Sequence, residues 1–224
     1  MGAVNKLDST KRKIYFFLIR RFFALKQIFF KKESNHFLFI LSPPFSGSTL
    51  LNQILSTSKN ISCNNNIGLK EGQHLPKAKE LMFHDKRWDA DTLFNWKEIK
   101  KIWLQYWDGS KAIFLEKSPP NIVRAFEIEK VFNEVKFICL VRNPYSQVEG
   151  KTRRHNKSVE EAANLILTYL QHQKKNIENL KNVLFISYEQ LTENPEKTKR
   201  KIIAFLPELS DIKMDLKYKA HNFK

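Results

Sequence analysis

A chain of 224 residues with 18 Phe and 42% hydrophobic residues can bury the core of one ordinary domain, which excludes an intrinsically disordered protein. Its formal net charge of +16 suits a polyanionic ligand. Nucleic acid is disfavoured as that ligand because the sequence has no zinc-finger, RNA-recognition or KH-like motif. Cys63 and Cys139 are too few for a disulfide framework, so a reducing compartment such as the cytoplasm is the expected location.

Residues 1–33 form a basic segment that we expect to be an amphipathic helix, separate from a domain over residues 34–224. Residues 1–32 hold nine Lys or Arg against one Asp. Charged residues interrupt the apolar stretch, so it is too short for a transmembrane span, and no signal-peptide cleavage site follows it. At helical spacing one face carries Tyr15, Leu18, Phe22, Leu25 and Phe29. This stripe either packs on the domain, which we favour slightly, or makes a peripheral contact with an anionic membrane surface.

From residue 34 onward, short apolar runs alternate with segments of helical periodicity. The expected strands are Phe37–Ser42, Ile61–Cys63, Ala112–Glu116, Lys136–Arg142 and Val183–Ser187. The expected helices are Thr49–Ser58, Leu75–His84, Ala90–Trp107, Ile122–Phe132, Val159–Leu180 and Pro195–Leu206. This alternation predicts an α/β fold with a mainly parallel sheet flanked by helices on both faces. In such sheets ligands bind at the carboxyl ends of the strands.

The first strand ends in a turn that suits a phosphate. The sequence Pro44-Phe45-Ser46-Gly47-Ser48-Thr49-Leu50 joins the strand to the start of a helix. Free N–H groups of such a turn and the positive end of the helix dipole point at one spot. The turn has no Lys before Ser-Thr, unlike the GxxxxGK[ST] loop of nucleotide triphosphatases. A nucleotide-dependent small-molecule kinase of related fold is therefore a weaker alternative.

Three other strand ends carry polar residues that complete an anion site. They deliver Lys117 in Glu-Lys-Ser-Pro, Arg142 in Arg-Asn-Pro, and Tyr188 in Tyr-Glu. Arg142 is suited to phosphate because its guanidinium can bind two oxygens at once. Any one of these residues alone reads as a structural contact, whereas their occurrence together at strand ends indicates a binding site.

The motifs SPPFSGSTLL, LEKSPPN, FICLVRNPYSQVEG and FISYEQLTENPE together resemble the PAPS-dependent sulfotransferases, where PAPS is 3′-phosphoadenosine-5′-phosphosulfate. The resemblance covers about Phe37 to Leu206. It implies a P-loop-like fold with PAPS as co-substrate and no metal. It also implies that the turn from Ser46 to Thr49 holds the 5′-phosphosulfate, that Arg142 holds the 3′-phosphate, and that Tyr188 lies near the adenine.

Two positions depart from that family's pattern. The family usually has Lys or Arg where this chain has Phe45, and often has Ser where this chain has Gly150. The first change removes a cation from the phosphosulfate, and Lys117 or Lys70 are candidates to replace it. The second removes a ligand of the 3′-phosphate, which the basic run at residues 151–154 could compensate.

Sulfuryl transfer also needs a base that takes the proton of the acceptor. We favour Glu71, with His74 second, because similar enzymes often place an acidic residue or a His in this region. The acceptor is expected to be a small molecule or a carbohydrate that presents a hydroxyl or an amine. The remaining alternative is a non-catalytic protein that binds PAPS, or the bisphosphate product PAP, and has lost activity through Phe45.

Overall fold

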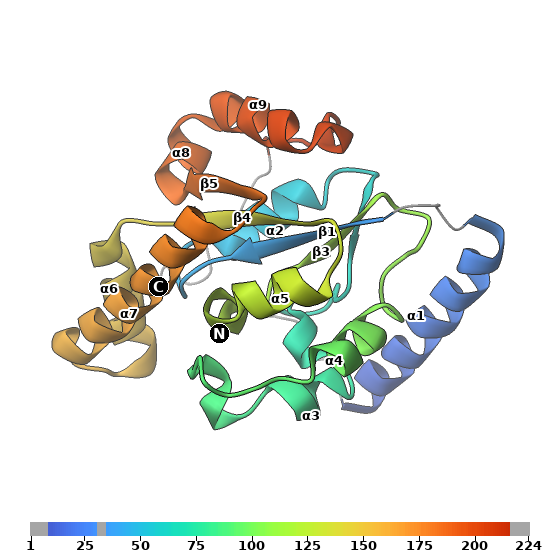
Figure 1. Ribbon diagram of the computed structural model, residues 1–224, viewed down its shortest axis with the longest axis horizontal. Coiled ribbons are helices and arrows are strands. Elements are labelled where there is room, and N and C mark those ends of the chain that lie inside the picture. Colours follow the sequence, from blue (N-terminus) through green and yellow to red (C-terminus); the bar gives the residue numbers. More distant parts are fainter. Residues whose placement is uncertain (1–8, 31–34, 216–224) are drawn as a thin grey trace.

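The computed structural model describes residues 9–30 and 35–215, and its centre is a five-stranded sheet (Figure 1). The strands are β1 (His36–Leu41), β2 (Ile61–Cys63), β3 (Ile113–Glu116), β4 (Val135–Val141) and β5 (Val183–Ser187). Their order is β2-β3-β1-β4-β5, and all four pairings are parallel. The predicted α/β class is confirmed, and each predicted strand lies within one residue of its expected bounds.

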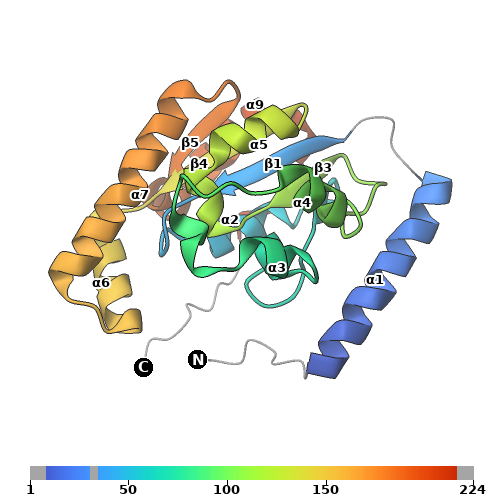
Figure 2. The ribbon, with the colours of Figure 1, turned by 60° about the horizontal axis from the view of Figure 1, so that its bottom comes forward.

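Helices connect the strands and cover both faces of the sheet (Figures 1 and 2). They are α1 (Ser9–Phe30), α2 (Ser48–Leu55), α3 (Ala78–Met82), α4 (Trp96–Trp103), α5 (Ala125–Val131), α6 (Pro144–His155), α7 (Val159–Asn179), α8 (Tyr188–Glu193) and α9 (Pro195–Phe205). Helix α4 is shorter than predicted because the Asn95 side chain accepts a hydrogen bond from the Glu98 N–H and so caps its start. Helices α6 and α8 were not among the expected elements.

Strand β1 lies in the middle of the sheet and divides the core into two layers. Phe37 and Phe39 face the layer that contains α1, α4 and α5, where they meet Phe132 at ring-centroid distances of 5.0 and 5.1 Å. Leu38 and Ile40 face the layer that contains α2 and α9. A strand buried on both faces has no polar alternation, which explains the continuous apolar run. Cys139 of β4 is fully buried, as expected of a core residue.

Helix α1 packs on the domain, but through a different face from the one predicted. Its buried residues are Phe16 and Phe23, which are 3% and 8% exposed. Most of the predicted stripe is instead exposed: Leu18 at 58%, Phe22 at 57%, Leu25 at 62% and Phe29 at 76%. The helix is apolar on both sides, so periodicity could not choose between them. Polar contacts settle the choice.

These polar contacts lie at both ends of the inner face of α1. The Lys26 ammonium pairs with Asp108 at 2.5 Å, and the Arg12 guanidinium donates to the His74 carbonyl at 2.9 Å. Between them the Phe16 ring meets Tyr106 edge-on at 5.7 Å. The predicted boundary between residues 33 and 34 lies outside the described residues and stays a prediction.

Candidate active site

The turn after β1 has the backbone of an anion cradle. Gly47 has φ of 87°, in the left-handed region, and a Cβ there would lie 2.3 Å from the Tyr188 ring. Helix α2 starts at Ser48, and the first N–H groups of a helix have no partner within it. Ser46 is fully buried, yet its hydroxyl has no protein partner. A buried hydroxyl that lacks a partner and lies at the N-terminus of a helix is suited to bind a ligand with anionic oxygens.

Arg142 and Tyr188 lie together beside this turn, as the sequence predicted for strand-end residues. The Arg142 guanidinium donates to the Phe45 carbonyl at 3.3 Å and lies 4.4 Å above the Tyr188 ring. The Gln147 amide donates to the Arg142 carbonyl at 2.6 Å, which attaches α6 to the end of β4. The ends of β1, β4 and β5 therefore converge on one place.

The two departures from the family pattern contact each other. A Cβ at Gly150 would lie 3.2 Å from the Phe45 ring, so the glycine leaves room for the aromatic side chain. Phe45 itself has φ of 66°, and the Arg154 guanidinium lies 5.3 Å above its ring. The His155 ring meets it edge-on at 5.9 Å. The Phe45 side chain therefore packs against α6. Arg154, which belongs to the basic run at residues 151–154, contacts its ring.

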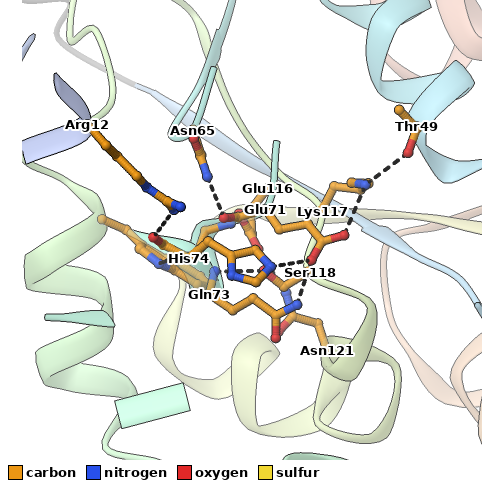
Figure 3. A network of polar contacts seen from close by, with 12 residues as sticks. Arg12, Thr49, Asn65, Glu71, Gln73, His74, Glu116, Lys117, Ser118 and Asn121 are labelled. Atoms are coloured by element: carbon orange, nitrogen blue, oxygen red, sulfur yellow. Dashed lines mark hydrogen bonds and ion pairs between the residues drawn. The ribbon is translucent and has the colours of Figure 1, made fainter. Parts of the chain in front are cut away.

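Lys117 links the turn to the predicted base (Figure 3). Its side chain is 2% exposed, and its ammonium donates to the Thr49 hydroxyl at 3.2 Å and to a Glu71 carboxylate oxygen at 3.4 Å. The other carboxylate oxygen of Glu71 lies 3.3 Å from His74 Nε2. The structure therefore brings the three predicted catalytic residues into one chain of contacts. Of the two candidate cations, Lys117 makes the contact with the turn, whereas Lys70 precedes Glu71 in a strained loop with φ of 57°.

The charge of Glu71 is set by its neighbours. Burial alone would raise the pKa of this carboxyl, but the hydrogen bond from His74, the Lys117 ammonium and the hydrogen bond from Gln73 together lower the pKa below its ordinary value. The Gln73 amide donates to Glu71 at 2.6 Å. Glu71 is therefore an ionised carboxylate at neutral pH, held between a cation and an imidazole.

A second set of contacts holds the loop that carries Glu71 and His74. The Gly72 N–H donates to the buried Glu116 carboxylate at 3.0 Å, and the Gln73 N–H donates to the Ser118 hydroxyl at 3.0 Å. A Cβ at Gly72 would lie 2.5 Å from Glu116, so the approach requires glycine. Both acceptors flank Lys117 in the sequence, so one strand end positions the cation and the base loop together.

No role was predicted for Glu116, and the contact between Arg12 and His74 could not be inferred from the sequence. Glu116 directly precedes Lys117 in the quoted motif, which was a signal, although its inward direction depends on the fold. Arg12 is 62 residues from His74 in the chain and has no motif around it. Within the described ranges, 9–30 and 35–215, no group of His, Cys, Asp and Glu could hold a metal ion.

Comparisons with known proteins agree with this fold. A family model described as "Sulfotransferase family" matches residues 38–210, which is most of the chain. The fold is similar to that of a sulfotransferase domain from the curacin biosynthetic pathway, with 20% identity over 80% of this chain and 77% of that one, and a TM-score of 0.53. It is also similar to a sulfotransferase from Alicyclobacillus acidocaldarius, with 14% identity over 84% and 87% of the two chains, and a TM-score of 0.55.

A sulfotransferase from Mycobacterium avium shares the fold as well, with 13% identity over 88% of this chain and 69% of that one, and a TM-score of 0.57. No curated protein sequence matches the chain. At these identities the solved structures support the fold, and the family model supports the chemistry.

Proposed function

This chain belongs to the sulfotransferase family, and we propose that it transfers a sulfuryl group from PAPS to a hydroxyl or amine of a small-molecule or carbohydrate acceptor. The family supports sulfuryl transfer in general; the donor, the acceptor class and the residue roles are our proposal. One observation carries it. The buried Lys117 ammonium contacts both the phosphate-type turn, at Thr49, and the candidate base loop, at Glu71. The same cation, Lys117, therefore contacts both the turn that would bind the donor and the loop that carries the candidate base.

The residues present fit a 3′-phosphorylated nucleotide. The buried Ser46 hydroxyl and the N–H groups from Gly47 to Thr49 would hold the 5′-phosphosulfate. The lack of a protein partner for the Ser46 hydroxyl supports this. The Arg142 guanidinium can donate two hydrogen bonds to the 3′-phosphate. The Tyr188 ring beside it would meet the adenine. PAPS supplies the sulfuryl group. The leaving group is a phosphate, and a nearby cation stabilises the negative charge that develops on it.

Lys117 takes the place of the cation that the family carries at position 45. Its ammonium lies 3.2 Å from the Thr49 hydroxyl, within the turn, and is excluded from water. A charge in such a site acts more strongly on developing negative charge than it would in water. Phe45 therefore removes one cation from the cradle and leaves a second, buried one in it.

His74 and Glu71 have different roles in removing the proton of the acceptor. The lowered pKa of Glu71 makes it a weak base, and its side chain is only 7% exposed, whereas that of His74 is 23% exposed. We therefore propose that His74 takes the acceptor proton and that Glu71 orients the imidazole and stabilises its charged form. This reverses the preference drawn from the sequence. Arg12 holds the backbone of His74 from α1.

Calorimetric titration with adenosine 3′,5′-bisphosphate and with ATP tests the proposal. We expect binding of the bisphosphate, and a loss of about tenfold to a hundredfold in affinity on Arg142→Ala, because that change removes charged hydrogen bonds. Arg200→Ala is the matched control, since Arg200 is exposed on α9 and lies outside the basic run at residues 151–154. Heat with ATP but none with the bisphosphate would contradict the proposal. Binding without sulfate transfer from labelled PAPS to any of a panel of alcohols and amines would support the non-catalytic alternative.

A further inference from the structure

The outer side of α1 is an exposed apolar stripe. Eight large apolar side chains on this helix are more than half exposed: Ile14 53%, Phe17 57%, Leu18 58%, Phe22 57%, Leu25 62%, Ile28 73%, Phe29 76% and Phe30 64%. Most of them recur at intervals of three and four residues, so they form a continuous stripe along one side of the helix. We call seven of these residues the outer stripe and leave out Phe30, because helical spacing puts it on the side of Phe16 and Phe23. Contiguous exposed apolar surface of this kind marks an interaction site.

The fold itself does not use the outer stripe. The opposite side of α1 makes the contacts with the domain, through Phe16, Phe23, Arg12 and Lys26. In Figure 2 the helix lies along one side of the molecule with α3 and α4 on its inner side. The described helices are not long and apolar enough to cross a membrane. The stripe therefore needs a partner that meets the helix from the side.

The charge of the helix indicates which partner fits. Within Ser9–Phe30 the sequence has no acidic residue. Four basic side chains of this helix are exposed, namely Lys11, Lys13, Arg20 and Arg21. The Arg21 guanidinium lies 5.5 Å above the Phe17 ring, so apolar and basic groups are interleaved on the outer side.

A second copy of the chain is a poor partner for this surface. A two-fold axis would bring the same patch of each copy together. Arg20 and Arg21 lie at the middle of the 22-residue helix, so antiparallel packing would bring these cations against their own copies. An anionic lipid surface instead takes apolar side chains into its interface and pairs the basic groups with its headgroups.

We propose that α1 docks this protein on an anionic membrane surface, with the helix lying flat and the outer stripe inserted at the boundary between headgroups and acyl chains. The buried inner contacts attach the helix to the catalytic domain, because Arg12 bonds to the backbone of His74. Docking through α1 therefore places the active site within one domain diameter of the lipid. The proposal does not depend on the identity of the donor or the acceptor.

Vesicle flotation tests the proposal with the full chain. Vesicles of phosphatidylcholine alone are compared with vesicles that contain about 30% phosphatidylglycerol, at about 0.15 M and about 1 M salt. We expect binding to the anionic vesicles at low salt and much weaker binding in the other conditions. The triple variant Leu18→Gln, Leu25→Gln, Phe29→Gln should lower the partition coefficient at least about tenfold, because it removes apolar insertion.

A matched control separates the stripe from general surface hydrophobicity. Leu93, Val159 and Leu167 are 87%, 66% and 56% exposed and lie outside α1, so changing all three to Gln should leave vesicle binding and the melting temperature unaltered. Three results would overturn the proposal. One is no flotation of the native chain with anionic vesicles, and another is equal loss in both triple variants. The third is a dimer in light scattering that the outer-stripe variant dissociates, without any binding to vesicles.

Discussion

The contact between Phe45 and Gly150 makes a prediction that needs no assumption about the ligand. A Cβ at residue 150 would lie 3.2 Å from two carbons of the Phe45 ring. Carbon atoms in favourable contact are about 3.5–4.0 Å apart, so the ring has to give way. Removing the ring should therefore make an alanine at position 150 easier to accept. The two substitutions are expected to be coupled.

The size of the coupling follows from two opposing effects. Glycine within a helix is less stable than alanine by about 0.5–1 kcal/mol, so Gly150→Ala alone should gain that amount if there were space. Crowding a packed site costs about 1–3 kcal/mol, and a half-buried ring that can tilt should be at the lower end. We expect Gly150→Ala to be neutral or destabilising in the native chain and to stabilise the Phe45→Ala variant, with a coupling of about 1 kcal/mol.

Urea unfolding of the native chain, the two single variants and the double variant measures this coupling. The control cycle pairs Phe45→Ala with Arg153→Ala, because Arg153 is on α6 but bonds to Glu149. The control pair should be additive within about 0.3–0.5 kcal/mol. If the first cycle is equally additive, the ring does not occupy the space beside Gly150, and the inference that the glycine leaves room for Phe45 is wrong.

Two further predictions concern the support of the base loop. Burial raises the pKa of Glu116, so the stability that its protonation contributes is fully present below the pKa of the unfolded chain and is lost as the pH rises through the folded pKa. Glu116→Gln should therefore raise the free energy of unfolding by about 1 kcal/mol at about pH 7 and by less at about pH 4, as calorimetry at both pH values would show; an equal gain at both would contradict this. Arg12→Ala, which removes the donor to His74, should cost about 1 kcal/mol in stability, lower kcat and leave the Kd of adenosine 3′,5′-bisphosphate unchanged. A weaker Kd with unchanged kcat would assign Arg12 a different role, and Arg12→Lys should recover part of the lost activity.

The strands could be predicted from the sequence because the apolar residues that they bury leave a local signal. Each is a short apolar run between polar residues, and β1 and β4 are almost wholly buried. Helices were harder where they are short and depend on tertiary contacts. Helix α8 has only six residues and is started by the Ser187 capping box, while α3 has five residues after Lys77, whose φ is 66°. Such segments have too few turns to show periodicity.

The positions of the candidate residues at strand ends were predictable, since parallel strands bring those ends to one edge. Lys117, Arg142 and Tyr188 lie at this edge, and their roles stay a prediction. The inner face of α1 was not predictable, because apolar residues occur on both sides of the helix and the side that packs is chosen by contacts more than 60 residues away, such as that of Arg12 with His74. Four residues of the outer stripe, Leu18, Phe22, Leu25 and Phe29, belong to the apolar face that the sequence predicted, but only the fold shows that this face is exposed.

The pair formed by Lys117 and Glu71 gives the sharpest test of the proposed chemistry. Both side chains are almost fully buried, and their charges lie 3.4 Å apart. An anion arriving at the turn meets the Lys117 ammonium and the Glu71 carboxylate together. Replacing the carboxylate by an amide removes the repulsion and leaves the ammonium free to face the anion.

Glu71→Gln should therefore bind adenosine 3′,5′-bisphosphate severalfold more tightly than the native chain, yet transfer sulfate about a hundredfold or more slowly, because His74 loses the group that orients it. Lys117→Met should do the opposite to binding. It leaves Glu71 buried without its cation, which should cost about 3 kcal/mol in stability at neutral pH and less in acid, where the carboxyl takes up a proton. Titration calorimetry and single-turnover assays on both variants decide the matter. If Glu71→Gln weakens bisphosphate binding as Lys117→Met does, the ammonium does not serve the nucleotide, and the replacement for the cation missing at Phe45 lies elsewhere.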